Sequence, residues 1–277
     1  MRIEDWRWGA AGLFLWVLTA QPVMAQAPTP MADWQLSAGV PLIAHFVKEV
    51  PHWQGAVGAG LVQLPAYEGS TRMRLLPVAA AEFRYRDVAY FSSSEGLGYN
   101  FFRGKNYRLG SSLGYDIGRE ERRSPKLAGQ GNLDSAPELK FYAERVWFPV
   151  VLRASVRHAL DGSTGWSSDL GAYLPVAGSS RYFVLAGSAV SFADGSSNQR
   201  RFGVSAAQGQ GGSLPPHQAG GGLRSASLGF SATYFWDDHW FANATGSVQQ
   251  LLGAAADSPI VEAETQTALL MVAGYRW

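Results

Sequence analysis

Hydrophobic and polar residues alternate with a period of two through most of this chain. Between residues 107 and 118 the apolar side chains fall on one face, and arginine, glycine, serine and aspartate fall on the other. The same alternation recurs in 150–160, 166–176 and 226–236. Because successive side chains of a β-strand point to opposite faces, the pattern predicts strands with one apolar and one polar face.

The predicted strands are long for a soluble protein. Most run for about 10 to 14 residues, whereas about five or six are usual in soluble sheets and about 9–11 cross a tilted bilayer. Aromatic residues lie near the segment ends, as the interfacial girdles of a membrane barrel require. These residues are Trp53, Phe83, Tyr85, Tyr107, Trp147, Trp166, Tyr234, Trp236, Trp240, Tyr275 and Trp277.

We therefore predict an all-β fold: a transmembrane antiparallel up-and-down β-barrel of about 12 strands. No stretch after Ala27 is apolar enough for a membrane helix, and only helices and closed barrels satisfy all backbone hydrogen bonds in lipid. The alternative is a soluble lipocalin-like barrel with its apolar face inside. The predicted strands are 53–64, 71–85, 88–101, 106–118, 137–148, 150–160, 165–176, 180–193, 199–205, 223–236, 239–252 and 264–277.

Two irregular stretches interrupt the strands. Residues 119–136 are charged and contain glycine and proline, and residues 206–222 are a Gly/Gln/Pro-rich low-complexity segment that we expect to be mobile. With both termini in the periplasm, this strand order places 206–222 outside the cell and 119–136 on the periplasmic side, where turns are usually short. Tight turns are predicted at Arg86–Asp87, Asp161–Gly162, Ala177–Gly178 and Asp237–Asp238.

The N-terminus has the pattern of a targeting segment. Arg2 and Arg7 precede an apolar run at residues 10–20, and small-residue cleavage patterns end at Ala25 and Ala27. The run is shorter than the about 20 residues of a membrane anchor, which is the alternative. We predict three parts: a cleavable signal peptide (1–25, cleaved after Ala25 or Ala27), an N-terminal periplasmic segment (26–52) and the barrel (53–277).

Composition agrees with a surface that faces lipid. Hydrophobic residues make up 47% of the chain and charged residues only 16%, against about 25% in soluble domains. The net charge of +1 gives no electrostatic attraction to nucleic acid. The absence of cysteine excludes disulfides, thiolate metal sites, thiol catalysis and a lipoprotein anchor.

The polar strand faces carry charged residues that would point into the barrel. One hypothesis is that the arginines line an anion-selective pore. The other, which we favour, is that they pair with carboxylates, including Glu138, Glu144 and Asp169, and fill the lumen. A barrel of about twelve strands lies between filled and channel-forming sizes. The predicted lumen-facing residues are Arg72, Arg74, Glu82, Arg84, Arg108, Asp116, Arg153 and Arg157.

We expect no enzymatic site, cofactor, metal or nucleic-acid partner. No metal-ligand spacing, phosphate loop or base-stacking platform occurs. A hydrolase remains as a minor hypothesis, because His158 lies near Asp161 at a strand end. The other histidines are scattered: His45, His52, His217 and His239.

The last strand alternates up to a terminal aromatic residue. Tyr275 and Trp277 fall on the same face as Leu269 and Met271. This ending resembles the signal that the barrel-assembly machinery reads. The simpler interpretation is an ordinary strand that closes the barrel, and both can hold together.

Several segments resemble the MipA/OmpV family of outer-membrane proteins, the MltA-interacting proteins. The segments are 65–70 (PAYEGS), 113–119 (LGYDIGR), 201–204 (RFGV), 251–261 (LLGAAADSPIV) and 274–277 (GYRW). The likeness spans nearly all residues from about 53 onward, although Trp277 stands where phenylalanine is usual. The family-motif residues are Pro65, Tyr67, Gly69, Ser70, Gly114, Tyr115, Gly118, Arg119, Phe202, Gly203, Val204, Leu251, Leu252, Gly253, Asp257, Ser258 and Pro259.

The resemblance implies a non-enzymatic barrel in the outer membrane of a Gram-negative bacterium, surrounded by outer-membrane lipid. The family's founding member is regarded as a scaffold that brings a lytic transglycosylase together with a peptidoglycan synthase. We therefore expect a scaffold of the cell envelope, with residues 119–136 as the candidate periplasmic dock. The alternative function is a narrow pore for small solutes.

Overall fold

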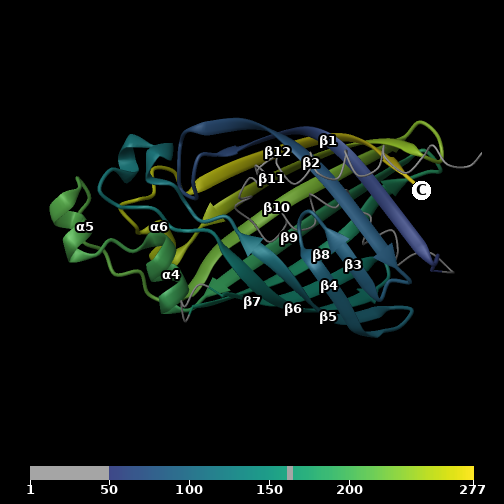
Figure 1. Cartoon of the computed structure of the whole chain (residues 1–277), viewed down its shortest axis with the longest axis horizontal. Helices are drawn as coiled ribbons and strands as arrows, with labels where there is room; N and C mark the ends of the chain where they lie inside the picture. The colour runs from purple at the N-terminus through teal and green to yellow at the C-terminus, as the bar shows by residue number, and fades with distance from the viewer. Residues whose placement is uncertain (1–49, 161–164) are drawn as a thin grey trace, which may run out of the picture.

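The computed structural model describes residues 50–160 and 165–277, which form one closed antiparallel barrel of twelve strands (Figure 1). Each strand pairs with its neighbours in sequence, and β1 closes against β12. The predicted fold class is confirmed. The strands are β1 (Trp53–Pro65), β2 (Met73–Tyr85), β3 (Ala89–Ser92), β4 (Gly96–Arg103), β5 (Tyr107–Asp116), β6 (Ala136–Trp147), β7 (Val150–Ala159), β8 (Trp166–Gly178), β9 (Tyr182–Ala193), β10 (Gly222–Phe235), β11 (Trp240–Leu251) and β12 (Thr265–Arg276).

Short helices occur only in the connections between strands of the described part of the chain. They are η1 (Glu121–Arg123), η2 (Pro125–Leu127), α4 (Gly195–Phe202), α5 (Ala206–Gly211) and α6 (Gly253–Ala256). None of these helices has the length and apolar character needed to span a bilayer. The predicted signal peptide, nearly all of segment 26–52 and the predicted turn at Asp161–Gly162 lie outside the described residues.

The strands turn their apolar faces outward. In β5, Arg108, Ser112 and Asp116 are buried, whereas Leu109 and Leu113 are exposed. This is the arrangement of a membrane barrel, because a soluble barrel buries its apolar face and exposes its polar one. The outward aromatic residues gather at one rim: Trp53, Tyr85, Phe102, Tyr107, Trp147, Tyr234, Trp240 and Tyr275 lie at the strand ends there.

The predicted strand 88–101 is wrong, because it is a hairpin of two short strands, β3 and β4. The chain reverses at Ser93–Glu95, and Gly96 adopts a left-handed φ of +77°, which favours glycine. The hairpin tip reaches only part of the way along β2, where the Ser93 amide donates to the Ala81 carbonyl at 2.9 Å. Within the described chain, residues 73–80 of β2 therefore have no strand neighbour on that side.

The predicted ninth strand, 199–205, is also wrong. Residues 195–202 form helix α4, which begins where the Asp194 side chain accepts a hydrogen bond from the Ser197 amide. Asn198 and Phe202, four residues apart, share the buried face of this helix. The two errors cancel in the strand count but change the direction of every strand between them.

All the long connections consequently lie at one end of the barrel. These are 66–72, 117–135, 194–221 and 252–264, while the turns 86–88, 104–106, 148–149, 179–181 and 236–239 lie at the other end together with the C-terminus (Figure 1). Outer-membrane barrels have short periplasmic turns and long extracellular loops. The prediction that 119–136 faces the periplasm is therefore wrong, and we call its end the outer end.

Two smaller predictions also change. The low-complexity segment 206–222 contains α5, which begins with a capping box between Ser205 and Gln208. Strand β8 continues through the predicted turn at Ala177–Gly178, and the chain reverses at 179–181. The predicted turn at Arg86–Asp87 is confirmed, because both residues adopt the positive φ values of a tight hairpin turn.

Candidate functional site

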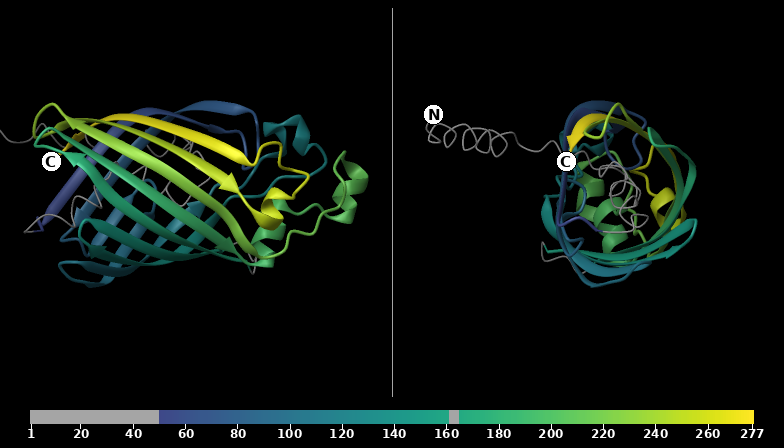
Figure 2. Two further views of the ribbon diagram at one scale, coloured as in Figure 1. Left: turned by 180° about the vertical axis from the view of Figure 1, so that it is seen from behind. Right: turned by 90° about the vertical axis from the view of Figure 1, so that its right-hand side faces the viewer.

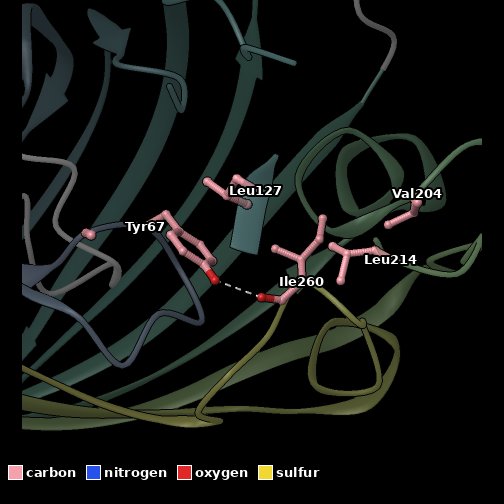
Figure 3. Packing of buried hydrophobic residues seen from close by; sticks show 6 residues of the cluster. Tyr67, Leu127, Val204, Leu214 and Ile260 are labelled. Atoms are coloured by element: carbon pink, nitrogen blue, oxygen red, sulfur yellow. Dashed lines mark hydrogen bonds between the residues drawn. The ribbon is translucent and has the colours of Figure 1, made fainter. Parts of the chain in front are cut away.

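The loops at the outer end pack on one another around a hydrophobic cluster, which we call the loop core (Figure 3). Leu127 and Ile260 have no exposed surface, and the Tyr67 hydroxyl donates to the Ile260 carbonyl at 3.0 Å. Viewed along the barrel, the helices of these loops lie inside the outline of the strands (Figure 2). The loops therefore cover the outer end of the lumen. The loop core consists of Ala66, Tyr67, Leu127, Val204, Leu214 and Ile260.

The structure brings most of the family-motif residues together around the loop core. Pro65, Tyr67, Gly69, Ser70, Gly118, Arg119, Phe202, Gly203, Val204, Leu251, Leu252, Gly253, Asp257, Ser258 and Pro259 all lie at this end of the barrel. The Ser258 hydroxyl donates to the Phe202 carbonyl at 2.6 Å, which joins segments 56 residues apart. Gly114 and Tyr115 lie apart in the wall of β5, where Tyr115 faces outward.

Glycine at position 118 is required by the backbone. Gly118 has φ +65°, and a Cβ there would lie 2.0 Å from the Leu133 carbonyl oxygen. This close approach lets Arg119 and Leu133 form a two-way backbone bridge, with N···O distances of 2.9 and 2.7 Å. The Arg119 guanidinium then reaches across to donate to the Arg201 carbonyl at 2.8 Å.

Burial shifts the pKa values of two loop residues. Desolvation, reinforced by the nearby Glu262, raises the pKa of Tyr67 well above its usual value. Desolvation and the like charge of Arg201 lower the pKa of Arg119 to about 10. At neutral pH Tyr67 is therefore a neutral hydrogen-bond donor and Arg119 remains charged.

A buried chain of ion pairs occupies the periplasmic half of the lumen, and we call it the inner ion network. Arg84 contacts Glu82 at 2.5 Å and Asp87 at 3.2 Å. Arg108 links Asp87 at 2.6 Å to Glu144 at 3.3 Å. Arg153 continues the chain from Glu144, at 3.1 Å, to Glu95. The network is thus Glu82, Arg84, Asp87, Glu95, Arg108, Glu144 and Arg153.

A second group of arginines lies toward the outer end, and we call it the outer arginine cluster: Arg157, Arg200, Arg201 and Arg224. Arg157 contacts Asp169 at 2.8 Å, while Arg200 and Arg201 both contact Asp116, at 2.9 and 2.7 Å. Arg201 also lies 3.8 Å from Glu68.

Sequence reasoning found only part of these two groups. It assigned Arg84, Arg108, Arg153, Arg157, Glu82 and Asp116 to the lumen, and their side chains do lie on the inner strand faces. Arg74 is half-buried on the inner face of β2, and Arg72 is exposed in the loop before it. Five inward residues were not predicted: Asp87, Glu95, Arg200, Arg201 and Arg224. The first four lie in turns or in a loop helix, where strand alternation gives no direction, and Arg224 lies at a β-bulge of β10.

Two further sectors of the lumen wall consist mainly of uncharged residues. On β10 and β11, Asn243 donates to Ser231 at 2.8 Å and to Thr233 at 2.9 Å, and Thr245 donates to Ser231 at 2.9 Å. A buried apolar cluster lines the inner side of β12, β1 and part of β2, and it includes Val62, Leu64, Leu270 and Val272, with Leu76 and Val78 packed against them. The lumen therefore has a charged, a hydroxyl-amide and an apolar wall.

The minor hydrolase hypothesis gains no support from the described residues. His158 faces outward and stacks on Trp166 at a centroid distance of 4.5 Å, while its ring nitrogen contacts the Gly165 carbonyl at 2.8 Å. The other half of the suggested pair, Asp161, lies outside the described residues. Within residues 50–160 and 165–277, no group of three or more side chains is arranged to hold a metal ion.

A closed barrel with an apolar outer face, a rim of aromatic side chains and a polar lumen defines an integral outer-membrane β-barrel protein. The chain belongs to the MltA-interacting protein MipA family, whose model matches residues 57–277. This confirms the resemblance drawn from the motifs and the location in the outer membrane.

Several solved structures share the barrel architecture at low similarity. OmpT of Vibrio cholerae is 8% identical, with 81% of this chain and 97% of that chain covered and a TM-score of 0.35. The toluene transporter TodX of Pseudomonas putida is 10% identical (89% and 93% covered, TM-score 0.40). An anion-selective porin from Comamonas acidovorans is 8% identical (81% and 98% covered, TM-score 0.36). These scores carry no conclusion about function. No curated protein matches the sequence.

Proposed function

We propose that this protein is an outer-membrane scaffold whose periplasmic rim binds a lytic transglycosylase of the cell wall and, through it, a peptidoglycan synthase. The observation that carries the proposal is the match of the MltA-interacting protein family over residues 57–277. A scaffold needs a stable platform, and a lumen crossed by buried ion pairs and covered by packed loops is suited to that role.

The surface available to such a partner is the periplasmic rim, because residues 119–136 lie at the opposite end. A groove of about 600 Å³ opens there, between the β6–β7 and β8–β9 turns. Its lining includes Phe148, Pro149, Val176, Phe183 and Phe235. The Phe148 side chain is 77% exposed, and exposed aromatic side chains are common anchors in protein interfaces.

Capture of a purified lytic transglycosylase by the detergent-solubilised barrel tests the proposal. We expect Phe148→Ala to weaken capture by at least about tenfold, as loss of a central aromatic anchor does. The matched control is Phe101→Ala, since Phe101 is 50% exposed on the outer face of β4. Capture that is unchanged by Phe148→Ala, or lost equally in both variants, would count against docking at this groove.

The alternative function, a narrow pore for small solutes, rests on the arginines in the lumen. The inner ion network and the loops over the outer end oppose it, since both occupy the path that a solute would take. Planar-bilayer recording of the purified barrel separates the two functions. We expect a silent bilayer, whereas discrete conductance steps that change with Arg108→Ser would favour the pore.

We also propose that export removes residues 1–25 or 1–27, as the small-residue patterns at Ala25 and Ala27 suggest. N-terminal sequencing of protein isolated from outer membranes should then begin at Gln26 or Pro28. Recovery of Met1 in the membrane fraction would contradict cleavage.

A further inference from the structure

Arg224 occupies an irregular position near the start of β10. The pairing between β9 and β10 shifts between Leu223 and Ser225, so that Arg224 is the extra residue of a β-bulge. Arg224 and Ser225 are consecutive, yet both are buried, at 7% and 1% exposure. A regular strand would send one of them outward into lipid. The bulge therefore turns an arginine into the lumen that simple alternation would not place there.

The Arg224 side chain lacks the carboxylate partners that the arginines of the inner ion network have. Its Nε is a buried donor without a hydrogen-bond acceptor, and no ion pair involves it within the described residues. Arg84 and Arg108, by comparison, each contact two carboxylates. A buried charge without a partner is strongly unfavourable, so an anion bound beside Arg224 would stabilise the folded barrel.

Arg224 faces a small, partly enclosed polar cavity of about 40 Å³ at the outer end of the lumen. The charged lining residues are Asp116, Glu138 and the whole outer arginine cluster. The carboxylates are already engaged: Asp116 holds Arg200 and Arg201, and Glu138 lies 3.9 Å from Arg157. Two further carboxylates, Glu68 and Asp169, contact Arg201 and Arg157 from outside the cavity lining.

The size and lining of the cavity limit what could occupy it. One water needs roughly 10–15 Å³ by the same measure, so the cavity has room for a group of only a few heavy atoms. Ser167 and Ser197 add hydroxyl groups to the lining. Guanidinium groups present planar pairs of N–H donors that match the oxygen spacing of phosphate.

We propose that this cavity binds one compact tetrahedral oxyanion, a phosphate group, with Arg224 as its principal partner and the other three arginines supplying the surrounding positive potential. The phosphate is either the free ion or a phosphate of a lipid A headgroup at the outer leaflet. The site is independent of the scaffold function, since it lies at the end of the barrel opposite the periplasmic rim.

The test measures the thermal transition of the full mature barrel in detergent, read as loss of the fast-migrating unboiled band on a gel. Each sample is heated with inorganic phosphate, with an equal ionic strength of chloride, or with lipid A in its phosphorylated and dephosphorylated forms. The variants are Arg224→Gln and the matched control Arg181→Gln, an exposed arginine in a periplasmic turn. Isothermal titration with phosphate gives the affinity directly.

We expect phosphate, and not chloride, to raise the transition temperature of the wild-type and Arg181→Gln barrels. Arg224→Gln should weaken phosphate binding by at least about tenfold, the usual effect of losing a charged hydrogen-bond partner. Without phosphate the same variant should be as stable as wild type or more so, because it removes an unpaired buried charge. A response to phosphorylated lipid A alone, lost in Arg224→Gln, would support the site and identify the lipid as its source.

Two results would overturn the proposal. One is a wild-type barrel whose transition responds to neither phosphate source. The other is an Arg224→Gln barrel that is destabilised to the same extent with and without phosphate, which would make Arg224 a structural residue only.

Discussion

Truncation of Leu127 to alanine should open the loop core without opening the barrel. Leu127 lies in η2 with no exposed surface, packed among residues of three other loops. Removing a fully buried leucine side chain costs about 2–5 kcal/mol, according to how well the site can collapse. Because every residue of the loop core lies in a loop, this loss should act on local opening of the loops.

Hydrogen exchange of the detergent-solubilised protein measures the loss in free energy of loop opening that Leu127→Ala causes. The amides of Leu127, Gln130 and Leu133 donate to backbone carbonyls inside the 117–135 loop at 2.7–3.0 Å. A loss of about 2 kcal/mol corresponds to roughly 30-fold faster exchange of these amides, and larger losses to proportionately more. The strand amides should exchange as in the wild-type protein.

The matched control is Leu113→Ala, because Leu113 is 48% exposed on the lipid-facing side of β5. That variant removes the same atoms from a surface where lipid or detergent replaces them, so loop exchange should not change. Loop amides that stay protected in Leu127→Ala, or strand amides that exchange faster to the same degree, would contradict this prediction.

Single contacts give four further predictions. Arg84→Met should lower the unfolding free energy in urea by about 3–5 kcal/mol by leaving the buried Glu82 carboxylate unpaired, whereas Asp87 keeps Arg108, and Glu82→Gln in the same chain should restore part of it. Gly118→Ala should cost at least about 1–2 kcal/mol, measured by urea unfolding, because its φ of +65° and a 2.0 Å approach exclude a Cβ. Two backbone amides lower the pKa of the Asp237 carboxylate. The folded pKa lies below the unfolded value of about 3.9, so the charged carboxylate stabilises the turn fully above that pH, and this stabilisation is lost as the pH falls through the folded pKa. The NMR chemical shift of the Trp240 amide should report the loss. If the terminal aromatic residue serves assembly, Trp277→Ala should reduce the fraction of the protein in outer membranes that is folded and heat-modifiable on a gel. An unchanged fraction would mean that Trp277 only ends the strand that closes the barrel.

Local features of the fold were predictable because the alternation within a strand is enough to show which of its side chains point inward and which point outward. Arg108 and Leu109 point inward and outward as their alternation requires. The hairpin tip at Ser93–Glu95 was not predicted because Tyr90 and Asn100, on either side of it, both point inward and are an even number of residues apart. The alternation therefore continues across the tip as it would in one unbroken strand. Helix α4 was missed because its start depends on the Asp194 cap rather than on a long apolar repeat.

The candidate sites were less predictable because they depend on which strands become neighbours. The Arg108–Glu144 pair joins residues 36 apart, and the Asp116–Arg201 pair joins residues 85 apart. Nothing in the sequence near Leu223 indicates the bulge that turns Arg224 inward. The motif residues could be identified from the sequence, but they come together only because the loops that carry them lie at the same end of the barrel. Counting 88–101 as one strand placed the 119–136 loop at the opposite end, so this grouping was not predicted.

The short β3–β4 hairpin makes the barrel an uneven fit to its bilayer. The 13 residues of β2 extend for about 43 Å, which at a tilt of about 45° spans roughly 30 Å, whereas the 4 residues of β3 span only about 9 Å. The outward apolar band of such barrels is about 25 Å tall. On the flank between β2 and β5 the hydrophobic wall is therefore too low for the membrane, and Pro77, which cannot donate a hydrogen bond, lies on the exposed strand edge. We therefore expect the bilayer to thin beside this flank, so that the protein perturbs the membrane on one side of its circumference.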